Sequence, residues 1–198
     1  MRVIAGTARS IPLVAPEGKD TRPTTDRIKE TLFNILQNEV NGAVFFDVFA
    51  GSGGIGIEAL SRGAAHAYFI DNSKAAIDSI MANLRKCRFT ESSDVMKGDA
   101  GIYMERALSK SGAETRKIIF MDPPYGRSFE FPVLNVIRKS PMVSSEDILI
   151  LETSLDSDTE AILDCGFQIL REKRYKNQRH LFLSKEEPDH HKDTGKEI

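Results

Sequence analysis

The alternation of short apolar runs with helical segments is the feature that most limits the folds open to this chain. Strand-like runs separated by helical segments of about ten to fifteen residues are typical of a mostly parallel sheet covered on both faces. The strands are predicted at Val44 to Phe49, Ala67 to Asp71, Asp94 to Lys97, Lys117 to Met121 and Ile148 to Glu152. The helices between them are predicted to begin near Gly54, Ser73, Ala100, Phe129 and Ser157. The sequence therefore predicts an α/β protein.

Beyond Gly166 this alternation stops. Residues 167–170 (FQIL) and 180–183 (HLFL) are two strand-like runs with no room between them for a crossover helix. Parallel strands need such a crossover, so we expect these two to pair antiparallel at one edge of the sheet. The sheet is then seven-stranded and mostly parallel. Residues 185–198 are charged and are predicted to form a flexible tail.

A separate block precedes the sheet. Residues 2–5 and 11–14 can form a small hairpin, and Thr24 or Thr25 is a suitable N-cap for the helix that follows. The residues that fall on one face of this helix are Ile28, Leu32, Ile35 and Leu36. We therefore expect one domain over residues 1–184, made of an N-terminal hairpin and helix extension (1–40) and a core (41–184).

Length, composition and cysteine content fit an intracellular domain. The chain has 198 residues, 40% of them hydrophobic, which is enough for a continuous core without metals or disulfides. Cys87 and Cys165 lie far apart and form no CxxC pair, which argues against a zinc site and a secreted disulfide framework. No long apolar stretch follows Met1, so we expect neither a signal peptide nor a membrane span. We expect a cytoplasmic protein with no metal and no membrane partner, and a monomer, since no coiled coil or apolar patch can be read.

Charge is distributed unevenly along the chain. The formal net charge is -2 at pH 7, whereas nucleic-acid-binding domains tend to be clearly basic. Between Arg171 and Lys185, however, six cations face one anion, Glu172, and the segment that follows is acidic. The six cations are Arg171, Lys173, Arg174, Lys176, Arg179 and Lys185. Taken alone, this run suits a solvated face as well as an RNA-binding one.

A glycine-rich loop follows the first predicted strand. Residues 51–56 (GSGGIG) match the GxGxxG pattern between a strand and a helix, and Asp71 lies twenty residues after Gly51 at the end of the next strand. This spacing is expected where an acidic side chain binds the ribose hydroxyls of an adenosine cofactor. Gly51, Ser52 and Gly53 would let the backbone approach that cofactor closely. A structural turn with a surface aspartate is the alternative.

Two further aspartates bear on the identity of the cofactor. Asp47 stands four residues before Gly51, where a dinucleotide would place its pyrophosphate, and a carboxylate there repels phosphate. S-adenosylmethionine has no phosphate and carries a sulfonium and an ammonium, so Asp47 favours it over NAD or FAD; a buried aspartate that caps loop amides is the alternative. Asp99, after the third strand, can reach the adenine edge or act as a helix N-cap.

The most specific motif is DPPY at 122–125, directly after the apolar strand that ends at Met121. Its two prolines fix the backbone and cannot extend the sheet, so Asp122 and Tyr125 are held stiffly. The amine of a nucleobase is a poor nucleophile because its lone pair is delocalised into the ring. If Asp122 and a proline carbonyl accept its N–H bonds, the nitrogen can direct its lone pair at a sulfonium methyl group, and alignment supplies most of the rate. Tyr125 would stack on the extruded base.

These motifs closely resemble the RsmD-like family of bacterial 16S ribosomal RNA (guanine-N(2)-)-methyltransferases. The likeness runs from Arg2 to about Ser184. Its matching segments are VIAG at 3–6, RPTTDR at 22–27, FAGSGGIGIEALSRG at 49–63, DPPY at 122–125, Glu152 at the end of the fifth strand and the C-terminal strand pair. Two segments depart from the family pattern, namely TARSIP at 7–12, with one cation where several are usual, and KNQ at 176–178, which lacks a typical glycine.

The resemblance implies a Rossmann-like class I S-adenosylmethionine-dependent methyltransferase fold that acts on one guanine 2-amino group in 16S ribosomal RNA or the assembling small subunit. The cofactor site would be Asp47, Gly51, Ser52, Gly53, Asp71 and Asp99, and the catalytic residues Asp122, Pro123, Pro124 and Tyr125. The RNA contacts would come from Arg22, Arg27, Arg127 and the basic hairpin with Lys173, Arg174, Lys176 and Arg179.

Two other functions stay open from the sequence. DPPY suits any exocyclic amine, so an adenine 6-amino group of DNA or RNA is an alternative target, although no separate target-recognition domain is visible. A nucleotide-binding oxidoreductase or a catalytically silent binding domain is the other alternative, against which both Asp47 and DPPY argue.

Overall fold

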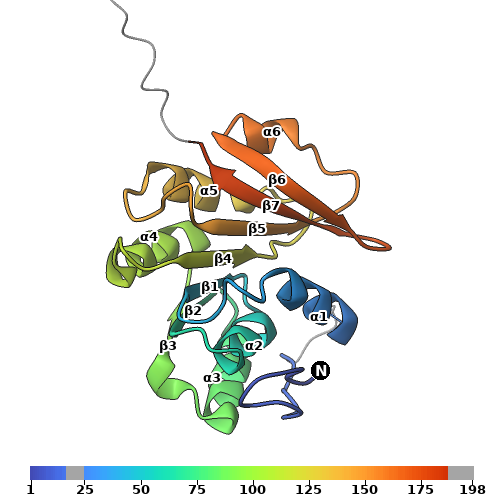
Figure 1. Cartoon of the computed structure of the whole chain (residues 1–198), viewed down its shortest axis with the longest axis vertical. Helices are drawn as coiled ribbons and strands as arrows, with labels where there is room; N and C mark the ends of the chain where they lie inside the picture. Colours follow the sequence, from blue (N-terminus) through green and yellow to red (C-terminus); the bar gives the residue numbers. More distant parts are fainter. Residues whose placement is uncertain (17–24, 187–198) are drawn as a thin grey trace, which may run out of the picture.

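The computed structural model describes residues 1–16 and 25–186, and within these residues seven strands form one sheet (Figure 1). The strands are β1 Val44–Val48, β2 His66–Asp71, β3 Ser93–Lys97, β4 Lys117–Met121, β5 Ile148–Thr153, β6 Phe167–Arg174 and β7 Arg179–Lys185. Their order across the sheet is β3-β2-β1-β4-β5-β7-β6. Strands β1 to β5 run parallel, and β7 pairs antiparallel with both β5 and β6. The predicted mostly parallel sheet with an antiparallel C-terminal hairpin is confirmed.

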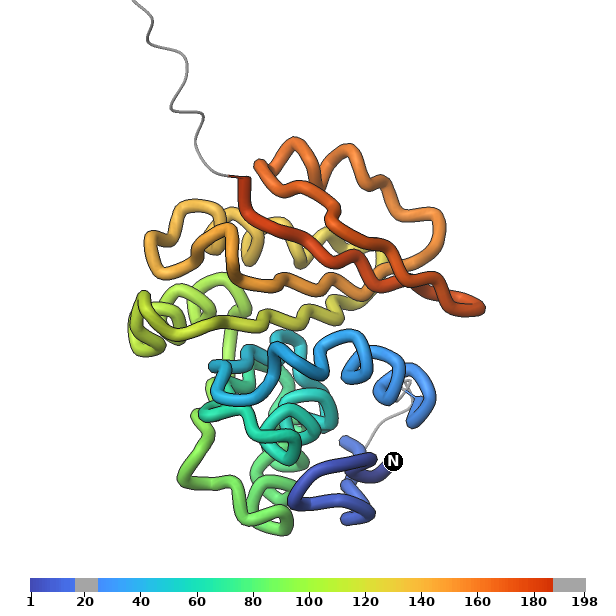
Figure 2. The backbone as a smooth tube through the Cα atoms, viewed as in Figure 1, coloured from blue at the N-terminus to red at the C-terminus, as the bar shows by residue number. Residues whose placement is uncertain are grey.

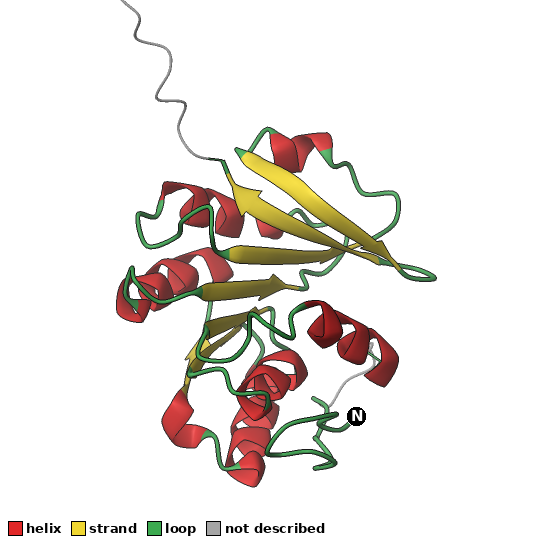
Figure 3. Ribbon diagram, in the orientation of Figure 1, coloured by secondary structure: helices red, strands yellow, loops and turns green. Residues whose placement is uncertain are grey.

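Helices cover both faces of this sheet (Figure 3). They are α1 Asp26–Ile35, α2 Gly54–Ser61, α3 Lys74–Cys87, α4 Ala100–Ser111, α5 Glu130–Lys139 and α6 Glu160–Leu163, with a short 3-10 turn η1 at Thr90–Ser92. One hydrophobic core lies between the sheet and α1, α2 and α3, and a second lies between the sheet and α4, α5 and α6. Successive residues of β1 alternate between them, with Phe45 in the first core and Phe46 in the second. Both faces of the inner strands are buried, which explains why β1, β4 and β5 are mostly apolar, whereas the edge strand β3 is more polar and partly exposed.

The starts of most helices agree with the sequence. Thr25 is the N-cap of α1, since its hydroxyl accepts the amide of Ile28, and Ser73 caps α3 in the same way. The last helix differs, because α6 spans four residues and begins at Glu160 rather than near Ser157. The Ser157 hydroxyl bonds the side chains of Thr153 and Ser154 at 2.5 and 2.7 Å, which holds this segment as a turn.

The N-terminal extension folds back on itself as a short antiparallel pairing. The amide of Val3 donates to the carbonyl of Ile11 at 3.0 Å and that of Leu13 to the carbonyl of Met1 at 3.1 Å, around the bridge between Arg2 and Pro12. The pairing is shorter than residues 2–5 and 11–14, because the amides of Ile4 and Ala5 donate to the Glu58 carboxylate of α2, at 2.8 and 3.0 Å. The segment lies beside α2 and α3 (Figure 2).

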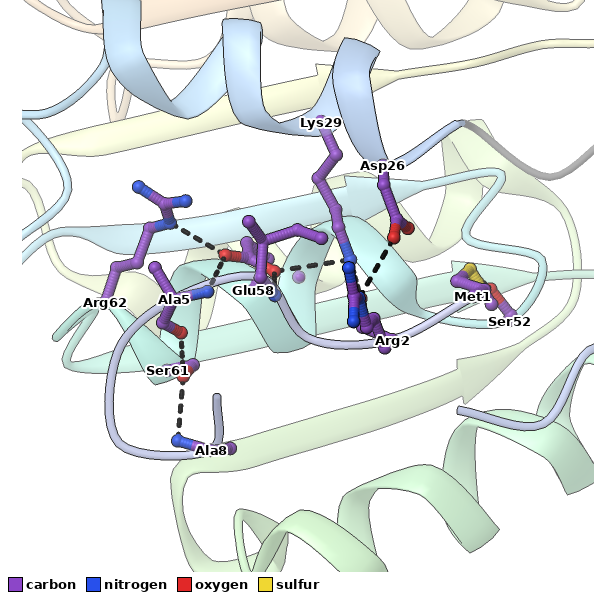
Figure 4. Close-up of polar contacts among 12 residues, drawn as sticks. Met1, Arg2, Ala5, Ala8, Asp26, Lys29, Ser52, Glu58, Ser61 and Arg62 are labelled. Carbon is purple, nitrogen blue, oxygen red and sulfur yellow. Dashed lines mark hydrogen bonds and ion pairs between the residues drawn. The ribbon is translucent and has the colours of Figure 1, made fainter. Parts of the chain in front are cut away.

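Glu58 is the centre of a buried charged cluster (Figure 4). Its fully buried carboxylate lies 3.2 Å from the Lys29 ammonium of α1 and 2.8 Å from Nε of Arg62. Lys29 also donates to the carbonyl of Arg2. Burial lowers the pKa of Lys29, and the charge of Glu58 opposes that shift. The cluster thus ties the first residues of the chain, α1 and α2 to one another.

The described helices are all too short or too polar to cross a lipid bilayer. β7 ends at Lys185, one residue beyond the predicted end of the domain. The predicted tail otherwise lies outside the described residues from 187 onward.

We expect Glu58→Ala to lower the free energy of unfolding by roughly 3–5 kcal/mol, because it leaves the buried Lys29 ammonium without its counter-ion and two backbone amides without their acceptor. Urea denaturation followed by circular dichroism measures the change. Glu30→Ala, at an exposed position of α1, is the matched control. Equal stability of the two variants would show that the cluster does not hold the extension in place.

Candidate active site

A large cavity opens at the carboxyl ends of the parallel strands. Its volume is about 630 Å³, and loops that follow β1, β2, β3 and β4 contribute to its wall, as does Glu152 near the end of β5. Strand order reverses between β1 and β4, and ligands of open α/β sheets bind at such a switch point. The glycine loop follows β1, and DPPY follows β4. They therefore meet at the cavity.

The glycine loop forms one side of the cavity. Gly51 and Ser52 line it, whereas Gly53 adopts a φ of 73° and turns toward the core as the N-cap of α2. A Cβ atom at Gly56 would lie 2.4 Å from the ring of Phe69, so this glycine allows α2 to pack closely on β2. The first two glycine-loop residues thus border the ligand space, and the next glycines build the turn and the helix contact.

Asp71 and Asp99 both line the cavity and are both held by backbone amides. Asp71 Oδ2 accepts the amide of Gly51 at 2.9 Å, and its Oδ1 accepts that of Ser73 at 2.8 Å. Asp99 is the N-cap of α4, with its carboxylate 3.0 Å from the amide of Ile102. The two functions weighed for Asp99, helix cap and cavity residue, are therefore compatible with each other.

Asp47 lies beneath the glycine loop and not in the wall of the large cavity. It is 2% exposed, and its carboxylate accepts the amide of Gly56 at 2.8 Å. A second cavity of about 40 Å³ separates it from Asp122 and Lys29. Burial raises the pKa of Asp47 to about 7, against the hydrogen bond from Gly56. The alternative of a buried aspartate that caps a loop amide is thus what the structure shows, and any effect on a ligand acts through the loop or through its charge.

The lining of the large cavity is acidic. Four of its described residues are carboxylates, and none is lysine or arginine. The four carboxylates are Asp71, Asp99, Asp122 and Glu152. Such a wall repels phosphate and attracts cations. The residues present therefore fit S-adenosylmethionine, with its sulfonium, its ammonium and its ribose hydroxyls, better than a dinucleotide.

The DPPY residues form the opposite side of the cavity. The Asp122 amide donates to Val48 of β1 at 3.3 Å, so the motif begins where the pairing of β4 with β1 ends. Pro123 is buried, while Tyr125 is 47% exposed at the cavity mouth. Burial raises the pKa of Asp122 well above its ordinary value, and the charges of Glu152 and Asp47 raise it further.

Glu152 is a site residue that the motif analysis did not place in the site. It is the last residue but one of β5, is 4% exposed and lines the cavity beside the DPPY loop. Its carboxylate accepts from Gln178 Nε2 at 2.5 Å, His180 Nε2 at 2.8 Å and the Tyr125 hydroxyl at 3.4 Å. An acidic residue at the carboxyl end of a buried strand was the available signal. Gln178 belongs to the KNQ segment that departs from the family pattern, and this departure puts an amide into the cavity wall.

The basic residues that the sequence predicts to bind RNA differ in their exposure to solvent. Arg27, Arg127, Arg174 and Lys176 are exposed, and Lys173 is partly exposed, whereas Arg22 lies outside the described residues. Arg179 is 6% exposed and bonds the carbonyl of Ser157 and the carboxylate of Glu172. Its guanidinium therefore faces the protein, and Arg179 is left out of the RNA contacts proposed below.

Sheet order, helix placement and an acidic cavity at the switch point define a Rossmann-like class I S-adenosylmethionine-dependent methyltransferase fold. A structure described as a putative sam-dependent methyltransferase from Streptococcus mutans matches 79% of this chain and 48% of its own with a TM-score of 0.61 at 14% identity, which shows the fold alone. A putative methyltransferase, yhhF, from Escherichia coli is more similar. Its TM-score is 0.76 at 30% identity, over 94% of this chain and 98% of its own.

The sequence identifies the family within this class. The family model described as Conserved hypothetical protein 95 matches residues 1–184. The putative rRNA methyltransferase YlbH of Bacillus subtilis is 38% identical over 77% of this chain and 82% of its own length. Ribosomal RNA small subunit methyltransferase D of Escherichia coli K12 is 31% identical over 87% and 84%. The chain belongs to this RsmD-like family, as its motifs predicted.

We expect Asp47→Asn to stabilise the fold at neutral and higher pH. As pH rises from about 4 to about 7, Asp47 ionises in the unfolded chain while the folded protein retains the proton. The free energy of unfolding therefore falls over this range, and the loss is complete above pH 7. Asparagine can still accept the amide of Gly56 but does not ionise. At pH 8 the free energy of unfolding of Asp47→Asn should exceed that of the wild-type protein by at most roughly 4 kcal/mol.

Urea denaturation at pH 5 and pH 8 tests this expectation, with Asp78→Asn at an exposed position of α3 as the control. The difference between Asp47→Asn and the wild-type protein should grow with pH, whereas the control difference should stay flat. Two parallel stability curves for Asp47→Asn and wild type would contradict the buried, proton-retaining state of Asp47.

Proposed function

We propose that this chain transfers a methyl group from S-adenosylmethionine to the 2-amino group of a specific guanine in small-subunit (16S) ribosomal RNA. The observation that carries this proposal is the position of Asp122 and Tyr125 on the edge of the acidic cavity, next to the glycine loop. The names of the relatives support ribosomal RNA as the substrate class. Either naked RNA or an assembling small subunit can present the target base.

The DPPY loop would hold the base amine for attack. The Asp122 carboxylate and a proline carbonyl accept its two N–H bonds, so that the nitrogen lone pair points into the cavity. Bound S-adenosylmethionine supplies an electrophilic methyl group on its sulfonium. The amine proton leaves after the nitrogen has become cationic, and Asp122 is the nearest acceptor on the chain. Tyr125, half exposed at the mouth, would stack on the base.

Exposed cations around the mouth would bind the RNA backbone. The residues between β6 and β7 lie at the carboxyl ends of the parallel strands, and Gln178 from this turn lines the cavity (Figure 1). Lys173, Arg174 and Lys176 lie in the same hairpin, Arg27 lies on α1 beside the lining residue Ile28, and Arg127 follows the DPPY loop. Contacts of these cations with phosphates would position the RNA without choosing its sequence.

Methyl labelling with nucleoside analysis tests the reaction and its target together. Purified protein is incubated with methyl-labelled S-adenosylmethionine and with small-subunit RNA or small subunits from cells that lack the enzyme. We expect label in 2-methylguanosine. Label confined to an adenine product, or to DNA, would keep the fold and overturn the proposed target.

The same assay tests the roles of the loop residues. Asp122→Ala should lower kcat by roughly 100-fold or more, because the amine loses its charged acceptor. Tyr125→Ala should weaken the reaction by about 5- to 150-fold through lost stacking, which corresponds to ~1–3 kcal/mol. Asp78→Ala, far from the cavity on α3, is the control. Unchanged methyl transfer by both loop variants would exclude the proposed mechanism.

The raised pKa of Asp122 predicts an acid limb in the pH profile. As pH falls through this raised pKa, Asp122 gains a proton and loses its charge, so kcat/KM for RNA should fall at a higher pH than an ordinary aspartate, about 3.9, would give. Glu152→Gln removes the nearby charge that raises this pKa most and should move the limb to lower pH. A limb that is identical in both proteins would assign it to another group.

A further inference from the structure

We propose that Glu152 binds the N1–H group of the target guanine and thereby makes the site select guanine over adenine. This inference rests on the proposed function and adds the residue that chooses the base. Glu152 is the second carboxylate at the cavity edge next to the DPPY loop.

The sheet places Glu152 beside Asp122. In the parallel pairing of β4 with β5, Met121 is opposite Leu151, so Asp122 and Glu152 are the next residues at the same level of neighbouring strands. Neighbouring strands lie about 4.8 Å apart, and residues at the same level of a parallel pair point to the same face. The charge of Glu152 also raises the pKa of Asp122, in accord with this proximity. Two adjacent carboxylates therefore border one side of the cavity.

Two hydrogen bonds from the β7 hairpin hold the Glu152 carboxylate in place, and it can still accept another hydrogen bond. Gln178 and His180, both on the opposite strand or its turn, donate to it at 2.5 and 2.8 Å. The third contact, from Tyr125, is 3.4 Å long and comes from a half-exposed side chain. A carboxylate has about four acceptor positions, so a substrate N–H can be added without breaking the two short bonds.

A second bond orients the histidine that supports Glu152. The Tyr175 hydroxyl lies 3.3 Å from His180 Nδ1, and burial raises the pKa of Tyr175 to about 12, which keeps it a donor. This arrangement matches the tautomer with its hydrogen on Nε2, directed at Glu152. His180 and Tyr175 are thus positioning residues that keep the Glu152 carboxylate an acceptor toward the cavity.

Guanine and adenine differ at the atom that such a pair of carboxylates would contact. Guanine presents two adjacent donors, N1–H and the 2-amino group, whereas adenine presents a donor amine next to the N1 lone pair. With Asp122 on the amine, Glu152 would accept from guanine N1–H but would face the lone pair of adenine N1. Unpaired polar groups in a buried site cost affinity, so the wrong base is rejected.

The base analogue 2-aminopurine separates this role from a structural one, because it keeps the 2-amino group but lacks the N1 hydrogen. Small-subunit RNA with guanine or 2-aminopurine at the target position is prepared by ligation, and kcat/KM for methyl transfer is measured on each. We expect the wild-type protein to prefer guanine by about 100-fold or more. Glu152→Gln can turn an amide N–H toward a ring nitrogen, so its preference should fall at least about tenfold.

The control is Glu146→Gln, the same chemical change at an exposed position ahead of β5, which should keep the wild-type preference. If Glu152→Gln lowers kcat/KM by the same factor on both RNAs, Glu152 only holds the β7 hairpin, and the proposal is overturned. If this variant does not fold, the wild-type ratio still decides, because equal rates on the two RNAs exclude recognition of N1–H. Failure of the proposed function is distinct, since the wild-type protein would then form no 2-methylguanosine.

Discussion

The parallel pairing of β1 with β4 is the constraint on which the site depends. The two strands are distant in sequence, yet the register from Val44 with Lys117 to Val48 with Met121 puts their carboxyl ends at one level. The loops that follow leave the sheet in different directions, since β1 leads into α2 on one face and β4 leads toward α5 on the other. A cavity remains between these loops, with the glycine loop on one side and the DPPY loop on the other.

The same geometry concentrates negative charge. Asp122 and Glu152 border the cavity, and Asp47 lies below it, so Glu152 and Asp47 both raise the cost of ionising Asp122. No cation of the described chain lines the large cavity, although Lys29 reaches the small one beneath it. An acidic site of this kind is destabilising for the empty fold and favourable for a cationic ligand. Binding of S-adenosylmethionine would therefore relieve repulsion that folding alone creates.

Buried polar side chains also connect parts of the chain that apolar packing would leave loosely related. Glu58 joins the N-terminal segment and α1 to α2, and Glu152 joins the β7 hairpin to the end of β5. Each carboxylate is satisfied by donors from segments that are remote in sequence. The positions of the extension and of the hairpin next to the cavity thus depend on charged groups whose partners cannot be read from local patterns.

The sequence by itself determined the α/β class, the seven strands and the positions of the glycine loop and DPPY directly after two of these strands. Apolar runs, N-caps at Thr25 and Ser73, and proline placement act over a few residues, which is why they can be read locally. Tertiary structure decided the rest. It buried Arg179 against Ser157 and Glu172, shortened the expected N-terminal hairpin through bonds to Glu58, and turned Glu152 into a cavity residue. These outcomes depend on which distant groups become neighbours, because a buried polar atom takes whatever partner the packed fold brings within reach.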